Sequence, residues 1–148
     1  MRVSAKAEYA CRAVLELSRS YGNLEVTQIN DIALHQGIPQ KYLVQILLLL
    51  QRAGIVKSKR GASGGYMLAK APSDITLGDV IRTTDGLLLS VESLEARSTS
   101  RSAGGAVGRE TLRDVWQEVQ EKLGGIMDGI TFDEICRKTD KNMSMYYI

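Results

Sequence analysis

The 148-residue sequence contains few of the side chains on which catalysis and metal binding depend. Its only histidine is His35, which we expect at the surface, and its two cysteines, Cys11 and Cys136, lie near opposite ends of the chain. An enzyme needs a nucleophile, a base or a metal site whose groups converge, and an iron–sulfur cluster needs about four ligands, mostly thiolates. We therefore expect no enzyme, no metal site and no cofactor.

The sequence also has no long apolar run and no apolar signal-peptide core at its start. The longest apolar stretch, residues 43–50, contains Gln45 and is far shorter than the roughly 20 residues that span a bilayer. We expect a cytoplasmic protein with no membrane partner, in which Cys11 and Cys136 do not form a disulfide. Cys11 has the spacing of a small buried hydrophobe, but a redox-sensing thiol at either position stays an alternative.

Charge is distributed unevenly along the chain, although the net charge is only +2. Residues 1–72 contain ten Lys or Arg and four Asp or Glu, a charge of +6, whereas residues 73–148 contain nine and thirteen, a charge of −4. A basic half is typical of nucleic-acid binding. The acidic half would be repelled by phosphate, so we expect it to point away from a duplex and to serve another purpose.

The basic half has the pattern of a helix-turn-helix. Ser4 is a plausible N-cap for a first helix to about Tyr21, and Thr27 for a short helix to about Gln36. Gly37 then provides a tight turn into a third helix of about four turns that Gly54 ends. Pro39 suits the first turn of that third helix. On the third helix an inward stripe is expected at four positions, namely Leu43, Ile46, Leu47 and Leu50.

A basic, glycine-tipped hairpin follows the third helix. Residues 55–60 and 66–68 read as two short strands around the tip 61–65, and Lys57, Lys59 and Arg60 supply the positive charge. Such cations suit a duplex backbone, and an arginine at the tip can enter a narrow minor groove. A nucleotide-binding loop would instead need Lys and Ser or Thr directly after the last glycine, opening a helix. The plainer alternative is an ordinary solvent-exposed edge strand whose lysines prevent aggregation.

These elements together predict a DNA-binding surface. The outward residues of the third helix would meet base edges, the hairpin would contact the backbone or minor groove, and the start of the first helix would clasp a phosphate. The candidate DNA-binding residues are Arg2, Lys6, Gln40, Lys41, Tyr42, Val44, Gln45, Lys57, Lys59, Arg60, Gly61, Ser63, Gly64, Gly65 and Tyr66.

The acidic half has the pattern of a pairing helix. From about Arg109 to Gly129, apolar residues alternate spacings of four and three, as in helices that associate along their length; this seam consists of Leu112, Trp116, Val119, Leu123, Ile126 and Ile130. Packing against the chain's own domain is the alternative. We expect three parts: a winged helix-turn-helix domain at 1–86, a flexible connecting loop at 87–108, and a dimerisation helix with a C-terminal tail at 109–148. The predicted fold is mainly α with a small β-hairpin wing.

Specific motifs then resemble one family. The chain is similar to the Rrf-two (Rrf2) family of winged helix-turn-helix regulators in Lys41-Tyr42-Leu43, Gln45, Ala53-Gly54-Ile55-Val56, Arg60-Gly61-Ala62-Ser63-Gly64-Gly65-Tyr66 and Ile75-Thr76-Leu77-Gly78-Asp79-Val80-Ile81. The resemblance extends over nearly the whole chain. It implies a homodimeric transcription factor, usually a repressor, whose recognition helix enters the major groove of a roughly palindromic operator while the wing enters the minor groove.

Two departures from the family pattern narrow this expectation. The iron–sulfur sensors of the IscR kind carry three cysteines before the long helix, but residues 91–108 here contain neither Cys nor His. The closer resemblance is therefore to the cluster-free CymR branch, which implies control of sulfur and cysteine metabolism and an O-acetylserine lyase as partner. Val44 stands where many members carry a glutamate, and valine can pack on a thymine methyl group but cannot accept a hydrogen bond from cytosine. The plainer reading is that Val44 joins Leu48 and Leu49 in an apolar surface.

Two other functions stay open from the sequence. A sensor of the IscR kind, redox-active or cluster-bearing, would be brown when purified anaerobically. A winged-helix adaptor that binds proteins would keep the dimer but would show no dependence of DNA affinity on Arg60.

Overall fold

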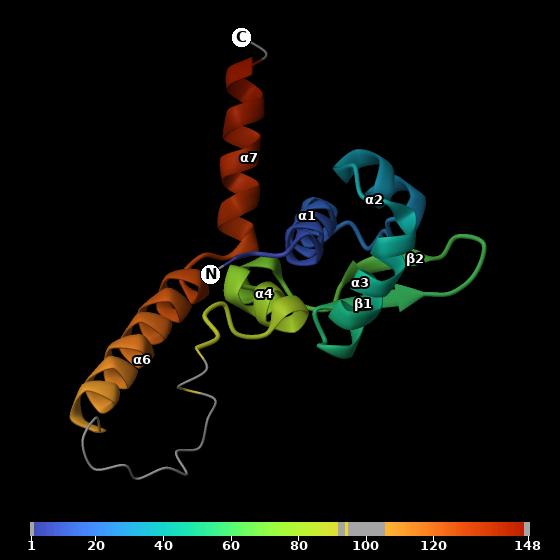
Figure 1. The fold of residues 1–148 in the computed structure, drawn as a ribbon. Helices are drawn as coiled ribbons and strands as arrows, with labels where there is room; N and C mark the ends of the chain where they lie inside the picture. Colours follow the sequence, from blue (N-terminus) through green and yellow to red (C-terminus); the bar gives the residue numbers. More distant parts are fainter. Residues whose placement is uncertain (1, 92–93, 95–105, 147–148) are drawn as a thin grey trace.

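The computed structural model describes residues 2–91, 94 and 106–146 and shows a mainly helical fold with one small sheet (Figure 1). The predicted fold class is therefore confirmed. The elements follow one another as α1 (Ala5–Arg19), α2 (Ile29–Gln36), α3 (Gln40–Arg52), β1 (Val56–Lys59), β2 (Gly65–Leu68), the 3-10 helix η1 (Pro72–Asp74), α4 (Leu77–Asp85), α6 (Ala106–Asp128) and α7 (Phe132–Tyr146).

Helices α2 and α3 form the predicted helix-turn-helix, and α1 packs against both of them. The ends of these helices follow local chemistry. The Ser4 hydroxyl accepts a hydrogen bond from the amide of Ala7, as expected of an N-cap. Gly37 adopts the left-handed conformation with φ 61° and ends α2. Helix α1 ends at Arg19, two residues before the predicted end. Pro39 occupies the N-cap position of α3, whereas the sequence predicted it in the first turn of that helix.

The prediction that Thr27 caps α2 is wrong. The N-cap residue is Gln28, and its side chain makes no capping hydrogen bond. Thr27 instead forms an isolated antiparallel bridge with Tyr66 of β2, in which the Thr27 amide donates to the Tyr66 carbonyl at 2.8 Å and the Tyr66 amide donates to the Thr27 carbonyl at 2.9 Å. Thr27, two residues before α2, therefore adds a third extended segment beside the two-stranded wing.

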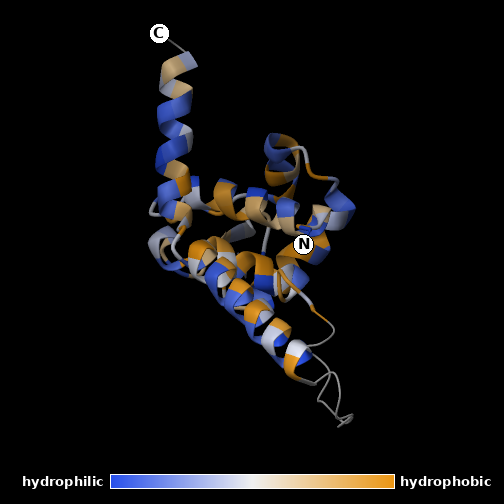
Figure 2. Cartoon of the chain, turned by 60° about the vertical axis from the view of Figure 1, so that its left-hand side comes forward, coloured by the Kyte–Doolittle hydropathy of each residue, from blue (hydrophilic) through white to orange (hydrophobic). Residues whose placement is uncertain are grey.

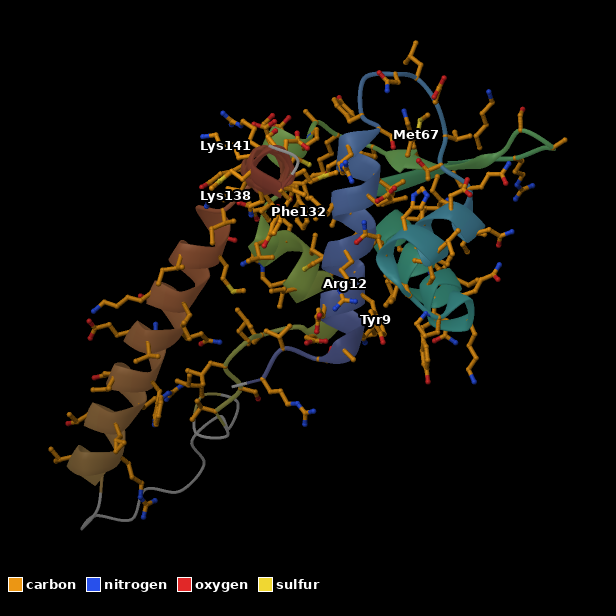
Figure 3. All side chains as sticks on the ribbon, turned by 90° about the horizontal axis from the view of Figure 1, so that it is seen from above. Tyr9, Arg12, Met67, Phe132, Lys138 and Lys141 are labelled. Carbon is orange, nitrogen blue, oxygen red and sulfur yellow. The ribbon has the colours of Figure 1, made fainter. Side chains whose placement is uncertain are left out.

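The hydrophobic core lies where α1, α3 and α4 meet, and it includes a residue from the C-terminal half. The four predicted inward residues of α3 are all buried. Helix α1 contributes Val14 and Leu17, and α7 contributes Phe132, which is 1% exposed. Figure 3 shows Phe132 at the base of α7, between α7 and α1. The acidic half of the chain is thus anchored in the core of the basic half.

The junction between α6 and α7 is attached to the start of α4 by backbone pairing. Thr76 and Thr131 form an isolated antiparallel bridge, the Leu77 amide donates to the Ile130 carbonyl at 2.8 Å, and the Phe132 amide donates to the Ile75 carbonyl at 3.0 Å. The guanidinium of Arg82 on α4 reaches the Asp128 carboxylate at 2.6 Å. These contacts fix where α6 leaves the domain.

Helices α6 and α7 extend in different directions from this junction (Figure 1). Helix α6 begins at Ala106, three residues before the predicted start, and continues through Gly124 and Gly125. Apolar and polar residues alternate around α6, and one end of the helix projects beyond the rest of the molecule (Figure 2). Within the described ranges no helix is both long and apolar enough to cross a membrane. Most of the predicted connecting loop, residues 92–93 and 95–105, lies outside the described residues.

Candidate nucleic-acid interface

Helix α3 presents a solvent-exposed face opposite its buried stripe. Gln40, Lys41, Tyr42, Val44 and Gln45 are all exposed, as the periodicity predicts. The ammonium group of Lys41 lies 5.8 Å from the centre of the Tyr42 ring, close enough for a weak cation–π contact. The candidate base-reading residues therefore point outward from a helix whose opposite face is held by the core.

Two side-chain hydrogen bonds that the sequence analysis missed connect α3 to its neighbours. At the N-terminal end, the Gln40 amide nitrogen donates to the Asn30 side-chain oxygen of α2 at 2.7 Å. At the C-terminal end, the Gln51 amide nitrogen donates to the Ser58 hydroxyl of β1 at 3.2 Å. Both pairs join residues of different elements, so no local pattern could have indicated them. They orient the wing and the helix-turn-helix as one surface.

The wing projects beyond the end of α3, on the side of α1 away from α6 (Figure 1). Lys57, Lys59 and Arg60 are exposed, as are Gly61 and Ser63 at the tip. Strands β1 and β2 pair antiparallel with Lys59 opposite Gly65. The cationic side chains of the hairpin are thus free to approach an anionic surface.

Two of the predicted wing glycines are explained by close backbone approach. A Cβ atom at Gly64 would lie 2.3 Å from the Lys59 carbonyl oxygen, and one at Gly65 would lie 2.6 Å from the Thr27 carbonyl oxygen. Tyr66 is half-buried and packs against the core while its backbone pairs with Thr27. These three residues shape the wing, and this role does not require a direct contact with DNA.

The start of α1 lies beside α3 and contributes two exposed cations, Arg2 and Lys6. A surface hollow of about 420 Å³ separates the two helices and is lined by Ala5, Lys6, Tyr9, Tyr42, Gln45 and Ile46. The chain start is held in place because both the amide and the hydroxyl of Ser4 donate to the Asp85 carboxylate, at 2.9 and 2.5 Å. Lys6 is therefore on the same surface as Tyr42 and Gln45, two of the candidate DNA-binding residues.

A buried carboxylate holds α2 against α1, and sequence reasoning did not find it. Glu16 of α1 is 9% exposed, and its two carboxylate oxygens lie 2.8 Å from His35 Nδ1 and 2.6 Å from the donating Gln36 amide nitrogen. His35 is exposed, as predicted, but it is paired. Because Glu16 binds the last turn of α2, directly before the Gly37 turn, it fixes the angle at which α3 follows.

The thiols do not form a ligand set for a metal or a cluster. Burial, and then the charges of Asp85 and Glu8, raise the pKa of Cys11 to about 11. Burial also raises the pKa of Cys136, on α7. Both groups therefore favour the neutral thiol at neutral pH. The described part of the chain contains no group of three or more His, Cys, Asp or Glu placed to hold a metal ion.

The predicted pairing seam is largely exposed on α6. Leu112 is 52% exposed, Ile126 63% and Trp116 38%, while Leu123 and Ile130 are partly buried near the junction with α4. Val115 adds an exposed apolar side chain beside Trp116 that was not among the predicted residues. Apolar side chains in such a row on one helix are typical of an interaction face.

Known proteins resemble this chain over nearly its whole length. The profile of the Rrf2 family, described as an iron-dependent transcriptional regulator, matches residues 3–138. The regulator CymR of Bacillus subtilis is 31% identical over 146 residues, covering 99% of this chain and 97% of its own. The regulator IscR of Klebsiella pneumoniae is 34% identical over 141 residues, covering 95% and 82%.

Solved structures agree with the sequence comparisons. The structure of CymR, the global cysteine regulator of B. subtilis, superposes with a TM-score of 0.74 at 28% identity and covers 93% of this chain and 98% of that one. T. potens IscR superposes with the same TM-score of 0.74 at 31% identity, covering 99% and 97%. The relatives are transcriptional regulators and not enzymes, and they include both the CymR and the IscR kinds. The chain therefore belongs to the Rrf2 family of transcriptional regulators.

Proposed function

We propose that this regulator binds DNA as a homodimer and represses transcription from a roughly palindromic operator. In this proposal α3 enters the major groove and the wing approaches the minor groove. The observation that carries it is the joint surface of α3, the wing and the start of α1. The polar residues of α3 are exposed there, and α1 and β1, which both pack against α3, contribute the exposed cations Lys6, Lys57 and Lys59, with Arg60 directly after β1. Cations of this kind neutralise phosphates and release condensed counterions.

The dimer in this proposal is formed along the exposed seam of α6. Helix α6 leaves the domain on the side away from the wing (Figure 1), so a second copy paired there would leave both DNA-binding surfaces free. A two-fold axis through the seam would present two α3 helices to half-sites about one duplex turn apart. The division into a DNA-binding part at 1–86, a connecting loop at 87–108 and a dimerisation part at 109–148 belongs to this proposal.

Within the family we favour a role of the CymR type, in sulfur and cysteine metabolism. The chain is similar to both CymR and IscR, so overall similarity does not separate the two. The absence of Cys and His from residues 91–108 favours a regulator without a cluster. By analogy with the CymR branch, an O-acetylserine lyase would then serve as co-regulator.

The first experiment selects fragments of genomic DNA with the purified protein and measures affinity for the best duplex at several salt concentrations. Arg60→Ala should weaken binding and make the slope of log K against log salt shallower by about one unit per lost phosphate contact. Arg137→Ala removes an exposed arginine from α7 and serves as the matched control. If the protein selects no DNA sequence, or if Arg60→Ala leaves its DNA affinity unchanged, the protein is instead an adaptor that binds other proteins.

The second experiment tests the seam by sedimentation. Trp116→Glu should convert the dimer to a monomer, because it places a charge in the middle of the apolar row. Tyr146→Glu, at an 89% exposed position near the end of α7, should leave the dimer intact. A wild-type protein that sediments as a monomer at all concentrations would refute the proposed arrangement.

The third experiment tests whether the protein is a regulator of the CymR kind or of the IscR kind. Purified O-acetylserine lyase is added to the protein and its selected duplex, and a CymR-type regulator should show increased DNA affinity. Anaerobic purification with absorbance measured in the visible range tests the alternative, because a brown protein would bear a cluster of the IscR kind.

A further inference from the structure

Helix α3 exposes two apolar side chains on the face that carries its polar residues. Val44 is 50% exposed and Leu48 is 46% exposed, and they lie four residues apart, one turn above the other on the same face. Four other apolar residues of the same helix are fully buried. We name Val44 and Leu48 the apolar ridge. The apolar ridge is not part of the buried core, so the apolar surface of the ridge is available to a partner.

The surroundings of the ridge limit what that partner can be. Lys41, Gln45 and Arg52 are exposed on the same helix, and α3 contains no Asp or Glu at all. The cations of the wing begin five residues after Arg52, and Lys57 and Lys59 are exposed. A partner must therefore combine negative charge around its rim with apolar groups at its centre. The major groove of DNA has this composition, because the 5-methyl group of thymine lies between two phosphate backbones.

We propose that the apolar ridge reads 5-methyl groups in the major groove, so that each half-site carries thymines opposite Val44 and Leu48. Gln45 lies beside Val44 and can form paired hydrogen bonds with adenine. Helix α3 contains neither Asp nor Glu, the side chains that typically accept from the cytosine amino group. The same ridge would accept 5-methylcytosine, which offers an identical methyl group. This inference rests on the proposed entry of α3 into the major groove.

The test uses the selected operator duplex, in which single thymines are replaced by deoxyuridine. This replacement removes one methyl group and leaves base pairing unchanged. Wild-type binding should weaken about fourfold for each methyl group read, the factor that corresponds to burying one such group. Replacement at other thymines should have no effect. The double variant Val44→Ser with Leu48→Asn should bind thymine and deoxyuridine duplexes equally.

Two further arms separate methyl reading from other causes. Met145→Ala removes a 75% exposed apolar side chain at the end of α7 and should keep the full sensitivity to deoxyuridine. In the second arm, a sensitive thymine·adenine pair is replaced by cytosine·guanine and then by 5-methylcytosine·guanine. The added methyl group should recover about fourfold in affinity for the wild type and nothing for the double variant.

The outcomes distinguish this inference from the function on which it rests. If the wild type binds its operator and every deoxyuridine replacement leaves its affinity unchanged, the ridge reads no methyl group. The proposed binding of the operator is not affected by that result. If the double variant binds all duplexes as the wild type does, the ridge instead faces a protein or a second copy of the chain. If no duplex is bound specifically, the proposed function fails as well.

Discussion

Single residues decide how the wing is attached to the domain. Gly65 pairs with Lys59 across the hairpin, and its Cα lies so close to Thr27 that no side chain fits. The sequence placed this glycine in the tip 61–65 as a candidate DNA contact, whereas the structure gives it a packing role at the base of the wing. The reason is the extended segment at Thr27, which approaches β2 from a part of the chain nearly forty positions earlier.

Gly65→Ala should therefore destabilise the wing. The added Cβ would meet the Thr27 carbonyl oxygen at 2.6 Å, and overpacking against backbone typically costs about 1–3 kcal/mol. Urea denaturation measures the loss, and hydrogen exchange at the Thr27 amide reports whether its bond to Tyr66 opens. Ser63→Ala, at an exposed position of the same tip, should change neither quantity. Unchanged exchange at Thr27 in Gly65→Ala would contradict the packing role.

Cys11 should be unreactive in the folded protein. Burial, aided by the charges of Asp85 and Glu8, raises its pKa to about 11, so the thiolate is scarce at neutral pH. Iodoacetamide at pH 7.5 should label Cys11 much more slowly in the native protein than in urea, as followed by mass spectrometry of peptides. Because the folded pKa is raised, the stabilising contribution is complete below pH 9 and falls as the pH rises towards 11. Rapid labelling of the native thiol would favour a redox sensor.

At the scale of elements, capping hydrogen bonds form where both partners are close in sequence. Thr76 and Asp79 form a capping box at the start of α4: the Asp79 amide donates to the Thr76 hydroxyl at 3.1 Å, and the Thr76 amide donates to the Asp79 carboxylate at 2.9 Å. Thr131 likewise accepts from the Glu134 amide at 3.2 Å at the start of α7. Thr27 failed as a cap because its backbone is engaged by β2, so tertiary pairing overrode the local preference.

The capping box predicts how the stability of α4 depends on pH. Burial raises the pKa of Asp79, but hydrogen bonds from Thr76 and the charges of Arg82 and Lys70 outweigh it, so the pKa lies below its usual 3.8. A lowered folded pKa means that the stabilisation is present above about pH 4 and is lost as the pH falls through the folded pKa. Asp79→Ala should cost about 1 kcal/mol at pH 7.

The measurement for Asp79→Ala is the free energy of unfolding in urea from pH 7 down to pH 2.5. The difference from wild type should shrink at the acid end, where the wild-type carboxylate is also neutral. Asp114→Ala removes an exposed carboxylate from α6 and provides the control for general charge effects. A constant difference across the pH range would show that the carboxylate charge is not involved.

At the scale of the whole molecule, the basic and acidic halves are not independent bodies. Phe132 follows the long helix in sequence, yet it packs in the core with residues of α1 and α3. The α6–α7 junction is also paired with the start of α4. An effect at α6, such as the binding of a partner, could therefore be transmitted to the helix-turn-helix through packed elements.

Phe132→Ala should destabilise the whole domain and not the C-terminal half alone. Truncating a buried phenylalanine typically costs about 3–5 kcal/mol, and Phe132 is 1% exposed. Fluorescence of Trp116 and far-ultraviolet circular dichroism should report a single shifted transition when protein concentration is held equal. Tyr146→Ala, at an 89% exposed position, is the aromatic control. Two separate transitions would show that the halves unfold independently.

The sequence by itself determined the helix-turn-helix, the wing, the outward face of α3 and the apolar row on α6. Each of these rests on periodicity, a cap or a glycine within about a dozen neighbouring residues, where backbone preference acts directly. Only the tertiary structure decided that Thr27 pairs with β2, that Glu16 holds α2, and that Phe132 completes the core. These contacts join residues far apart in the chain, and their pairing is selected by packing of the whole domain, which no local pattern encodes.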